Sequence, residues 1–150
     1  MKANAVGKNC IEVDRAYLAG LIDADGAIMA LIEPHREKKF HFRVRMMIKI
    51  TQKKKEDLLF LLPMLGIGSI RANRTTHDWI LRDQKQISHV LSLIRPYSRM
   101  KRRQIDIAHT ILRLRIGNRK DLLRAAQLAD TLSRFNVRSK NRRKNYATMI

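Results

Sequence analysis

The sequence contains little cysteine and no long apolar runs. It holds one cysteine, Cys10, in 150 residues, which excludes an intramolecular disulfide and disfavours a structural zinc site. Its apolar runs, such as residues 58–62, are far shorter than the roughly 20 residues that a membrane-spanning helix needs. The start of the chain has no apolar core of a signal peptide. We therefore expect an intracellular protein with no membrane partner.

Acidic residues are also scarce. The chain has 13 Asp and Glu against 32 Lys and Arg, which gives a net charge of +19 and a pI near 11.1. Such an excess of positive charge opposes compaction and attracts polyanions. Nucleic acid is therefore the expected partner. A membrane surface is less favoured, because the basic residues do not gather on one amphipathic helix.

The chain lacks a low-complexity linker and an internal repeat. Its length suits one domain over residues 1–150, with a basic tail from about residue 138. The hydrophobic pattern predicts the order αββαββααα. The expected helices cover residues 12–25, 53–65, 83–95, 99–115 and 120–135, and the expected strands cover 27–33, 40–50, 69–73 and 78–82.

The strand at 40–50 gives the clearest signal. Apolar residues alternate there with His41, Arg43, Arg45 and Lys49, and only Met47 breaks the alternation. A period of two indicates a half-buried strand. Two hairpins then make an antiparallel sheet with helices on one face, which is an α+β fold. In the second hairpin, Trp79 and Leu81 are expected in the core.

Several residues are expected to begin or end helices. Asn9 or Asp14 is the expected N-cap of the first helix. Pro63 and Gly66 are expected to stop the helix at 53–65. Asp83, followed three residues later by Gln86, is typical of a capping box.

The most informative segment is residues 18–26, Leu-Ala-Gly-Leu-Ile-Asp-Ala-Asp-Gly. It reads as a buried helix that ends in two acids, and a carboxylate in such a place is costly unless a cation meets it. Ala16, Gly20 and Ala24 recur every four residues, with Ala19 one step aside. Small residues at this spacing let a second helix approach closely. We expect two such helices to cross, each bringing an acid to one place.

These nine residues match, letter for letter, the motif of the LAGLIDADG homing endonucleases, and the chain resembles the short, single-motif, homodimeric members. The resemblance implies a saddle-shaped sheet over DNA and metal-dependent cleavage near the centre of the site, across the minor groove, with 3′ overhangs. Mg²⁺ is the expected cofactor, and Mn²⁺ or Ca²⁺ could substitute for binding. Because only one motif is present and two strands must be cut, a homodimer on a pseudo-palindromic site is expected.

The two acids cannot serve one site unless the helix has already ended, because positions two apart on a helix point about 200° apart. The resemblance assigns the metal to Asp25, with the carbonyl of Ala24 as a further ligand. Asp23 is expected to hydrogen-bond to backbone or to a partner helix. The predicted dimer interface comprises Ala16, Ala19, Gly20, Asp23 and Ala24.

Two further catalytic residues follow from the resemblance. Gln52 is expected to order water, and alignment through Pro96 places a lysine of the site at Lys101, with Arg99 or Arg103 as alternatives. A basic residue often found a few places after the glutamine is Glu56 here, so no residue is assigned to that role; Lys54 or Lys55 could replace it.

DNA contacts are predicted on the exposed face of the sheet, although a charged face that is merely solvated is the ordinary alternative. Arginine can pair with guanine in the major groove, and apolar side chains can touch thymine methyls. The residues on this face are Met29, Leu31, Glu33, His35, Lys38, His41, Arg43, Arg45, Lys49, Arg71, Asn73, Asp78, Ile80 and Arg82. Phosphate contacts are predicted for Ser139, Lys140, Arg142 and Lys144, the alternative being a disordered basic tail.

The sequence thus predicts a site-specific double-strand DNA endonuclease in an organelle or a prokaryotic cytoplasm. An intron-RNA maturase and a non-catalytic DNA-binding protein on the same scaffold stay open as alternatives. A structural basic protein, such as a ribosomal one, would explain the charge but not the acid pair.

Overall fold

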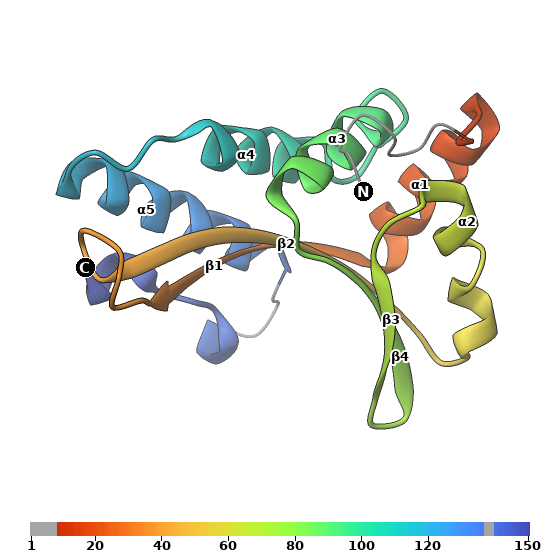
Figure 1. Cartoon of the computed structure of the whole chain (residues 1–150), viewed down its shortest axis with the longest axis horizontal. Coiled ribbons are helices and arrows are strands. Elements are labelled where there is room, and N and C mark those ends of the chain that lie inside the picture. The colour runs from red at the N-terminus through yellow and green to blue at the C-terminus, as the bar shows by residue number, and fades with distance from the viewer. Residues whose placement is uncertain (1–8, 137–139) are drawn as a thin grey trace.

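The computed structural model describes residues 9–136 and 140–150 (Figure 1). The helices are α1 (Glu12–Asp25), α2 (Leu61–Leu65), α3 (Gln84–Ile94), α4 (Arg102–Arg113) and α5 (Arg119–Asn136), and the strands are β1 (Gly26–Pro34), β2 (Phe42–Gln52), β3 (Ser69–Asn73) and β4 (Thr76–Leu81). The short 3₁₀ turns are η2 (Lys55–Leu58), η3 (Lys140–Arg142) and η4 (Tyr146–Met149). None of the helices in these ranges is long and apolar enough to cross a membrane.

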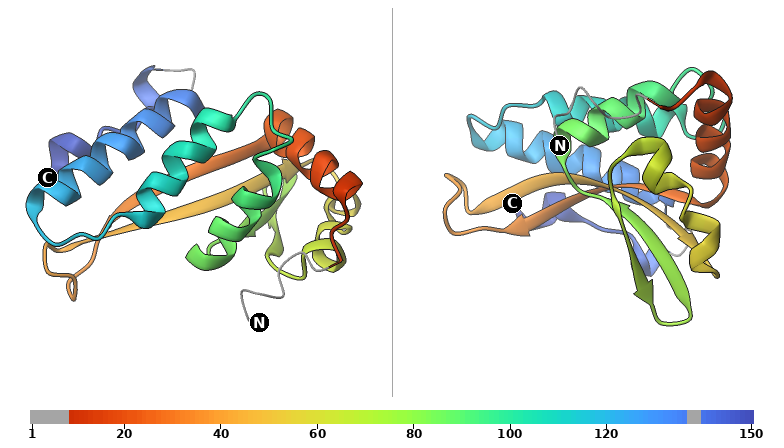
Figure 2. Two further views of the ribbon diagram at one scale, coloured as in Figure 1. Left: turned by 90° about the horizontal axis from the view of Figure 1, so that it is seen from above. Right: turned by 45° about the vertical axis from the view of Figure 1, so that its right-hand side comes forward.

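The strands form one antiparallel sheet in the order β1-β2-β4-β3. Strands β1 and β2 pair along their length, from Gly26 opposite Ile50 to Pro34 opposite Phe42. The sheet is curved, and α3, α4 and α5 cover one of its faces, while most of the opposite face is left uncovered (Figures 1 and 2). The predicted α+β fold, with its four-stranded antiparallel sheet and helices on one face, is confirmed.

The core lies between the sheet and the helices. Alternate residues of the two long strands are buried there, as the period of two predicts: Ile28, Ala30 and Ile32 on β1, and Met46, Ile48 and Ile50 on β2. They belong to one cluster with buried residues of α1, α3 and α4. Helix α1 is therefore held at one end of the sheet. Its last residue, Asp25, directly precedes the first residue of β1.

Two predicted helix boundaries are wrong. The N-cap of α1 is Ile11 rather than Asn9 or Asp14, and the Asp14 carboxylate accepts a hydrogen bond from the Ile11 amide at 3.2 Å. Pro63 does not stop a helix but lies in the first turn of α2, where a backbone N–H has no partner within the helix. Gly66 does end α2, with φ of 69°.

Strand β2 begins two residues later than predicted. The preceding residues form a turn in which the His35 amide donates to the His41 carbonyl at 2.8 Å. His41 has a φ of 62°, which takes it out of the extended conformation. In contrast, the expected cap of α3 is confirmed, because the Asp83 carboxylate accepts from the Gln86 amide at 2.9 Å.

A side chain continues the pairing of β2 where β4 ends. The last pair between these strands joins Ile48 and Leu81. Beyond it, Gln84 Oε1 accepts from the Met46 amide at 2.7 Å and Gln84 Nε2 donates to the Met46 carbonyl at 2.9 Å. The N-terminal part of β2 therefore pairs with β1 alone among the described strands.

The C-terminal segment, residues 140–150, is anchored to α5. Asp130 is 4% exposed, and its carboxylate accepts from the amides of Tyr146 and Ala147 at 2.6 and 3.0 Å. Ser133 Oγ accepts from the Lys144 amide at 2.7 Å. The basic tail is therefore folded from residue 140 onward, and a disordered tail is wrong for that segment.

Trp79 fills the core beneath the β3–β4 hairpin and depends on a glycine. Its side chain is fully buried, and its Nε1 donates to the Ile67 carbonyl at 3.3 Å. Gly68 has a φ of +82°, and a Cβ at this position would lie 2.3 Å from Trp79 Nε1. Both the backbone conformation and the space require glycine here.

Asp23 joins α1 to the α3–α4 loop. Its side chain is 7% exposed. Its carboxylate accepts from Ser98 Oγ at 2.6 Å and from the amides of Arg99, Met100 and Lys101 at 2.7, 3.0 and 3.2 Å. Burial alone would raise the pKa of Asp23, but these hydrogen bonds outweigh it and hold the pKa below its ordinary value.

We predict that Gly68→Ala destabilises the protein by about 2 kcal/mol or more, because overpacking and a left-handed backbone add. Urea unfolding measures this change. Gly117→Ala is the control, since the nearest atom to its Cβ is Asp121 Oδ2 at 3.6 Å, and its effect should stay within about 0.5 kcal/mol. Equal midpoints for the two variants would contradict the analysis.

We predict that Asp23→Asn lowers the free energy of unfolding at pH 7 by about 1–3 kcal/mol, because one of the two acceptor oxygens is replaced by an NH2 group that faces other donors. Since the pKa of Asp23 is lower in the folded state, its carboxylate stabilises the fold above the unfolded-state pKa. That stabilisation is lost as the pH falls through the folded-state pKa. The difference between wild type and variant should therefore shrink below about pH 4 in urea titrations. A difference that is constant down to low pH would be inconsistent with this role.

Candidate active site and nucleic-acid interface

The end of α1 brings an exposed carboxylate against the end of β2. Asp25 is the last residue of α1 and Gln52 is the last residue of β2. Gln52 Nε2 donates to Asp25 Oδ2 at 2.7 Å. The contact orients the carboxylate and leaves its other oxygen, Oδ1, for a further partner.

Lys101 reaches the same place from the α3–α4 loop. Its Nζ donates to the carbonyl of Asp23 at 2.7 Å. Burial lowers the pKa of Lys101, and the nearby Asp23 and Asp25 carboxylates partly offset the effect. The structure therefore brings the three predicted catalytic residues, Asp25, Gln52 and Lys101, together from three elements. Their chemical roles stay predictions.

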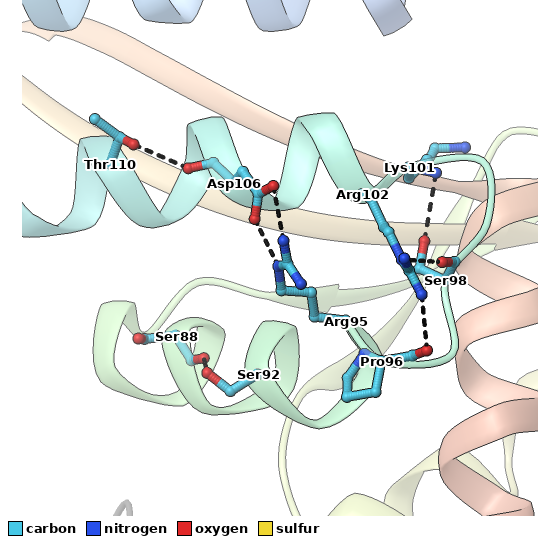
Figure 3. Close-up of polar contacts among 9 residues, drawn as sticks. All are labelled: Ser88, Ser92, Arg95, Pro96, Ser98, Lys101, Arg102, Asp106 and Thr110. Atoms are coloured by element: carbon cyan, nitrogen blue, oxygen red, sulfur yellow. Dashed lines mark hydrogen bonds and ion pairs between the residues drawn. The ribbon is translucent and has the colours of Figure 1, made fainter.

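Polar contacts hold the α3–α4 loop in place (Figure 3). Arg102, the first residue of α4, donates from Nε to the Ser98 carbonyl at 2.8 Å and from Nη2 to the Pro96 carbonyl at 3.1 Å. Arg95 and Asp106 form an exposed two-pronged ion pair between α3 and α4, at 2.6 and 3.0 Å. The two Arg102 contacts thus fix the backbone of the loop that carries Lys101, whereas the Arg95–Asp106 pair joins two side chains and contacts no backbone group of the loop.

The alternatives to Lys101 lie elsewhere. The guanidinium of Arg103 sits over the ring of Phe135, 5.5 Å from its centroid. Arg99 meets the site through its backbone amide, which donates to Asp23. Glu56 is exposed in η2, as are Lys54 and Lys55 beside it, and none of the contacts described for the site involves them.

One chain offers few ligands for a divalent metal. Within residues 9–136 and 140–150, no three His, Cys, Asp or Glu side chains form a group that could hold an ion. The Asp25 carboxylate and the carbonyl of Ala24, in the last turn of α1, are oxygen ligands of the kind that Mg²⁺ prefers. Mg²⁺ is commonly held by one or two carboxylates together with phosphates. The residues present fit a metal that is shared with a second chain and with a nucleic acid.

The exposed surface of α1 is made of small and apolar side chains. Val13 and Tyr17 are 72% and 61% exposed, and Ala16, Gly20 and Ala24 are exposed beside them. A Cβ at Gly20 would meet no atom within 4 Å, so packing within the chain does not require glycine there. This surface is therefore free to meet another helix.

Two predicted interface residues do not lie on that surface. Ala19 is fully buried in the core of its own chain. Asp23 is buried as well and bonds to its own α3–α4 loop rather than to a partner helix. A helical pattern alone did not separate these positions from their exposed neighbours, because α1 is apolar on both sides.

The uncovered face of the sheet carries paired charges on β1 and β2. Arg43 lies opposite Glu33 in the strand register, and Arg45 lies opposite Leu31. Both guanidinium groups contact the Glu33 carboxylate at 2.9 Å. The Arg43 hydrogen bond, with Arg45 adding to it, holds the pKa of Glu33 below its ordinary value. Met29 lies on the same face, opposite Met47.

Asp78 and Ile80 are buried, although they were predicted on the exposed face of the sheet. They are 0% and 4% exposed. The Asp78 carboxylate accepts from Thr51 Oγ1 at 2.6 Å and from Asn73 Nδ2 at 2.9 Å, and lies 4.0 Å from Lys49 Nζ. Asp78 therefore orients exposed neighbours on this face.

The other predicted DNA contacts lie at the surface where the structure describes them. Exposed or partly exposed positions on the sheet and its hairpins are Leu31, His35, Lys38, His41, Lys49, Arg71, Asn73 and Arg82. Arg142 and Lys144 are exposed in the C-terminal segment. Ser139 lies outside the described residues, as does the side chain of Lys140.

Sequence reasoning missed the residues that support the site. No sequence pattern indicated Ser98, Gln84 or Arg102. Each of them contacts a group that is distant in sequence or lies in a loop. Asp130 left a weak signal, since it lies between Ala129 and Leu132, which are also buried. An acid on the apolar side of a helix indicates a buried polar contact.

Comparisons with known proteins agree with this geometry. The family model described as LAGLIDADG endonuclease matches residues 18–112. The DNA endonuclease I-CreI of Chlamydomonas reinhardtii is 30% identical over 98 residues, 64% of this chain and 60% of that protein. I-CvuI of Chlorella vulgaris is 31% identical over 121 residues, 77% of this chain and 74% of that protein. The chain thus spans less than two thirds of I-CreI.

Solved structures show the same fold. I-CvuI, in complex with the I-CreI target in the presence of Mg and with the DNA not cleaved, has a TM-score of 0.78 and 26% identity, over 87% of this chain and 86% of that one. The archaeal intron-encoded I-Vdi141I, complexed with DNA, has a TM-score of 0.74 and 22% identity, over 85% and 87%. With the motif at residues 18–26 and a family match over residues 18–112, this protein belongs to the LAGLIDADG endonuclease family.

Proposed function

We propose that the protein is a site-specific, metal-dependent endonuclease that cuts both strands of duplex DNA as a homodimer. The observation that carries the proposal is the convergence of Asp25, Gln52 and Lys101 beside an open sheet face that is rich in cations. The related I-CreI and I-CvuI are DNA endonucleases. The net charge of +19 supports a polyanionic substrate.

The Asp25 carboxylate and the Ala24 carbonyl would hold the metal. A divalent metal, when bound, neutralises charge on the phosphate and activates water for attack on phosphorus. Gln52 holds the Asp25 carboxylate at 2.7 Å and has its amide oxygen available to orient water. The cationic Lys101 lies where it can stabilise negative charge that develops on the phosphate oxygens.

The homodimer follows from the surface of α1. Two copies crossing through Ala16, Gly20 and Ala24 would bring their Asp25 carboxylates close together, since Asp25 is the last residue of the same helix. A two-fold axis between the copies supplies one acid for each DNA strand. The preferred target is then pseudo-palindromic.

The sheet would read one half of the target. Strand β1 has 9 residues, which span about 30 Å at ~3.3 Å each, comparable to about 9 base pairs. Two copies would cover about 18 to 24 base pairs by the same estimate. Arg43 and Arg45 are placed for base contacts in the major groove, while Arg142 and Lys144 are placed for phosphates.

We predict that Asp25→Asn abolishes cleavage but keeps DNA binding, because the metal loses its carboxylate while the sheet is unchanged. The wild type should first be incubated with a randomised duplex library and Mg²⁺, and the cut ends sequenced to define the target. Cleavage and affinity of the variant are then measured on that target, with Gln127→Leu as an exposed control on α5. Asp25→Asn cleavage near the wild-type rate would refute the assignment. Binding of DNA or structured RNA by a wild type that cuts nothing would favour a binder or a maturase.

We predict that Gly20→Leu prevents dimerisation without unfolding the chain. Leucine is a better helix former than glycine by roughly 0.8 kcal/mol, and its side chain has room in the single chain, but it separates the two α1 helices. Sedimentation equilibrium measures the change, and Gln127→Leu adds the same apolar group away from α1. A Gly20→Leu variant that still sediments as a dimer would place the interface elsewhere.

A further inference from the structure

We propose that Arg102 is a positioning residue for Lys101, and that it acts by holding the carbonyl groups of the α3–α4 loop. The inference rests on the proposed function for its catalytic consequence. Its structural part, that Arg102 fixes the loop backbone, can be tested separately. Arg102 belongs to neither the matched motif nor the set of residues that the sequence indicated.

The contacts of Arg102 are directed at the loop. Nε donates to the Ser98 carbonyl at 2.8 Å, and Nη2 donates to the Pro96 carbonyl at 3.1 Å (Figure 3). Hydrogen bonds from a charged donor are stronger than neutral ones. One planar guanidinium therefore fixes two peptide groups, which lie three and five residues before Lys101 in the chain.

Arg102 and Asp23 hold opposite sides of the same backbone. The Asp23 carboxylate accepts from the loop amides of Arg99, Met100 and Lys101. Arg102 instead binds carbonyl groups of the loop, which Asp23 cannot contact because a carboxylate has no donor. The Ser98 residue links the two sets, since its hydroxyl donates to Asp23 and its carbonyl accepts from Arg102. Asp23 and Arg102 together therefore bind both amide and carbonyl groups of the loop, which restricts rotation of its peptide units.

The place of Arg102 in α4 is unfavourable for the helix itself. The first turn of α4 contains no acidic residue, and its N-cap, Lys101, makes no side-chain cap. A cation at a helix N-terminus opposes the helix dipole. An arginine here does not help to start the helix, and its observed contacts are those that hold the loop.

The geometry of Lys101 depends on that backbone. Its ammonium is half-buried and reaches the Asp23 carbonyl at 2.7 Å. Among the described residues, Asp23 provides the hydrogen-bond acceptor for the ammonium, and the Asp25 carboxylate lies nearby. Since displacements near 1 Å at a reacting centre can cost about a hundredfold in rate, a loose loop would lower turnover while leaving the DNA-binding face intact.

The test combines kinetics with a double-mutant cycle. Arg102→Ala should lower the single-turnover cleavage rate about tenfold on the target recovered from the library, with an unchanged Kd for that DNA measured in Ca²⁺. Lys101→Ala should lower the rate further. The Arg102→Ala and Lys101→Ala double variant should be no slower than Lys101→Ala alone, because Arg102 acts through Lys101. Arg102→Lys, which can bind only one carbonyl at a time, should recover part of the loss.

Arg95→Ala is the matched control. It also removes one cation from the same loop region, but its partner is Asp106 in an exposed ion pair, which contributes little. It should cleave at the wild-type rate. Amide hydrogen exchange at residues 99–101 should quicken in Arg102→Ala and not in Arg95→Ala.

Additive rates in the double variant, or unchanged exchange in Arg102→Ala, would overturn the inference. A weaker Kd that accounts for the whole loss of activity would make Arg102 a phosphate contact instead. A wild type that cuts no DNA would refute the proposed function, while the exchange measurement would still decide whether Arg102 holds the loop.

Discussion

The buried carboxylate of Asp23 is the contact on which the site depends. It lies in the last turn of α1, two residues before the exposed Asp25, and it binds the loop that carries Lys101. One helical turn therefore sets the position of an acid and of a lysine that come from segments distant in sequence. The same helix presents Gly20 and its small neighbours to solvent. Under the proposed function, this single rigid element would couple assembly, metal binding and phosphate binding.

The periodic features of the sequence were sufficient for the fold. Alternation on residues 40–50 identified a strand with one buried face, and the acid–glycine end of α1 predicted a site at Asp25, which lies beside Gln52 and Lys101 in the structure. Burial on the opposite face of the sheet was harder to predict. Asp78 and Ile80 have the parity of exposed residues but are buried, and Asp78 is covered by its contacts with Thr51, Asn73 and Lys49. Ala19 was misplaced because α1 packs on its own core as well as offering a free side.

The excess of positive charge is not uniform over the sheet. Glu33 holds both Arg43 and Arg45 at 2.9 Å, so these arginines are already paired and oriented before any ligand arrives. Under the proposed function, a DNA base would have to compete with a carboxylate for them, which would make a poorly matched sequence more costly than it would be for free arginines. In contrast, Arg142 and Lys144 lie on a segment fixed by the buried Asp130, and they add charge without that competition.

The Gln84 side chain, rather than a residue of β4, pairs with the Met46 backbone. This difference affects how the sheet can move. Past Met46, the outer half of β2 is a two-stranded ribbon with β1, and such ribbons twist more than wider sheets. The β3–β4 hairpin is attached only to the inner half. Under the proposed function, the two parts of the uncovered sheet face would change pitch separately, with the distal ribbon following the local groove of a bent duplex while the end nearest Asp25 keeps its geometry.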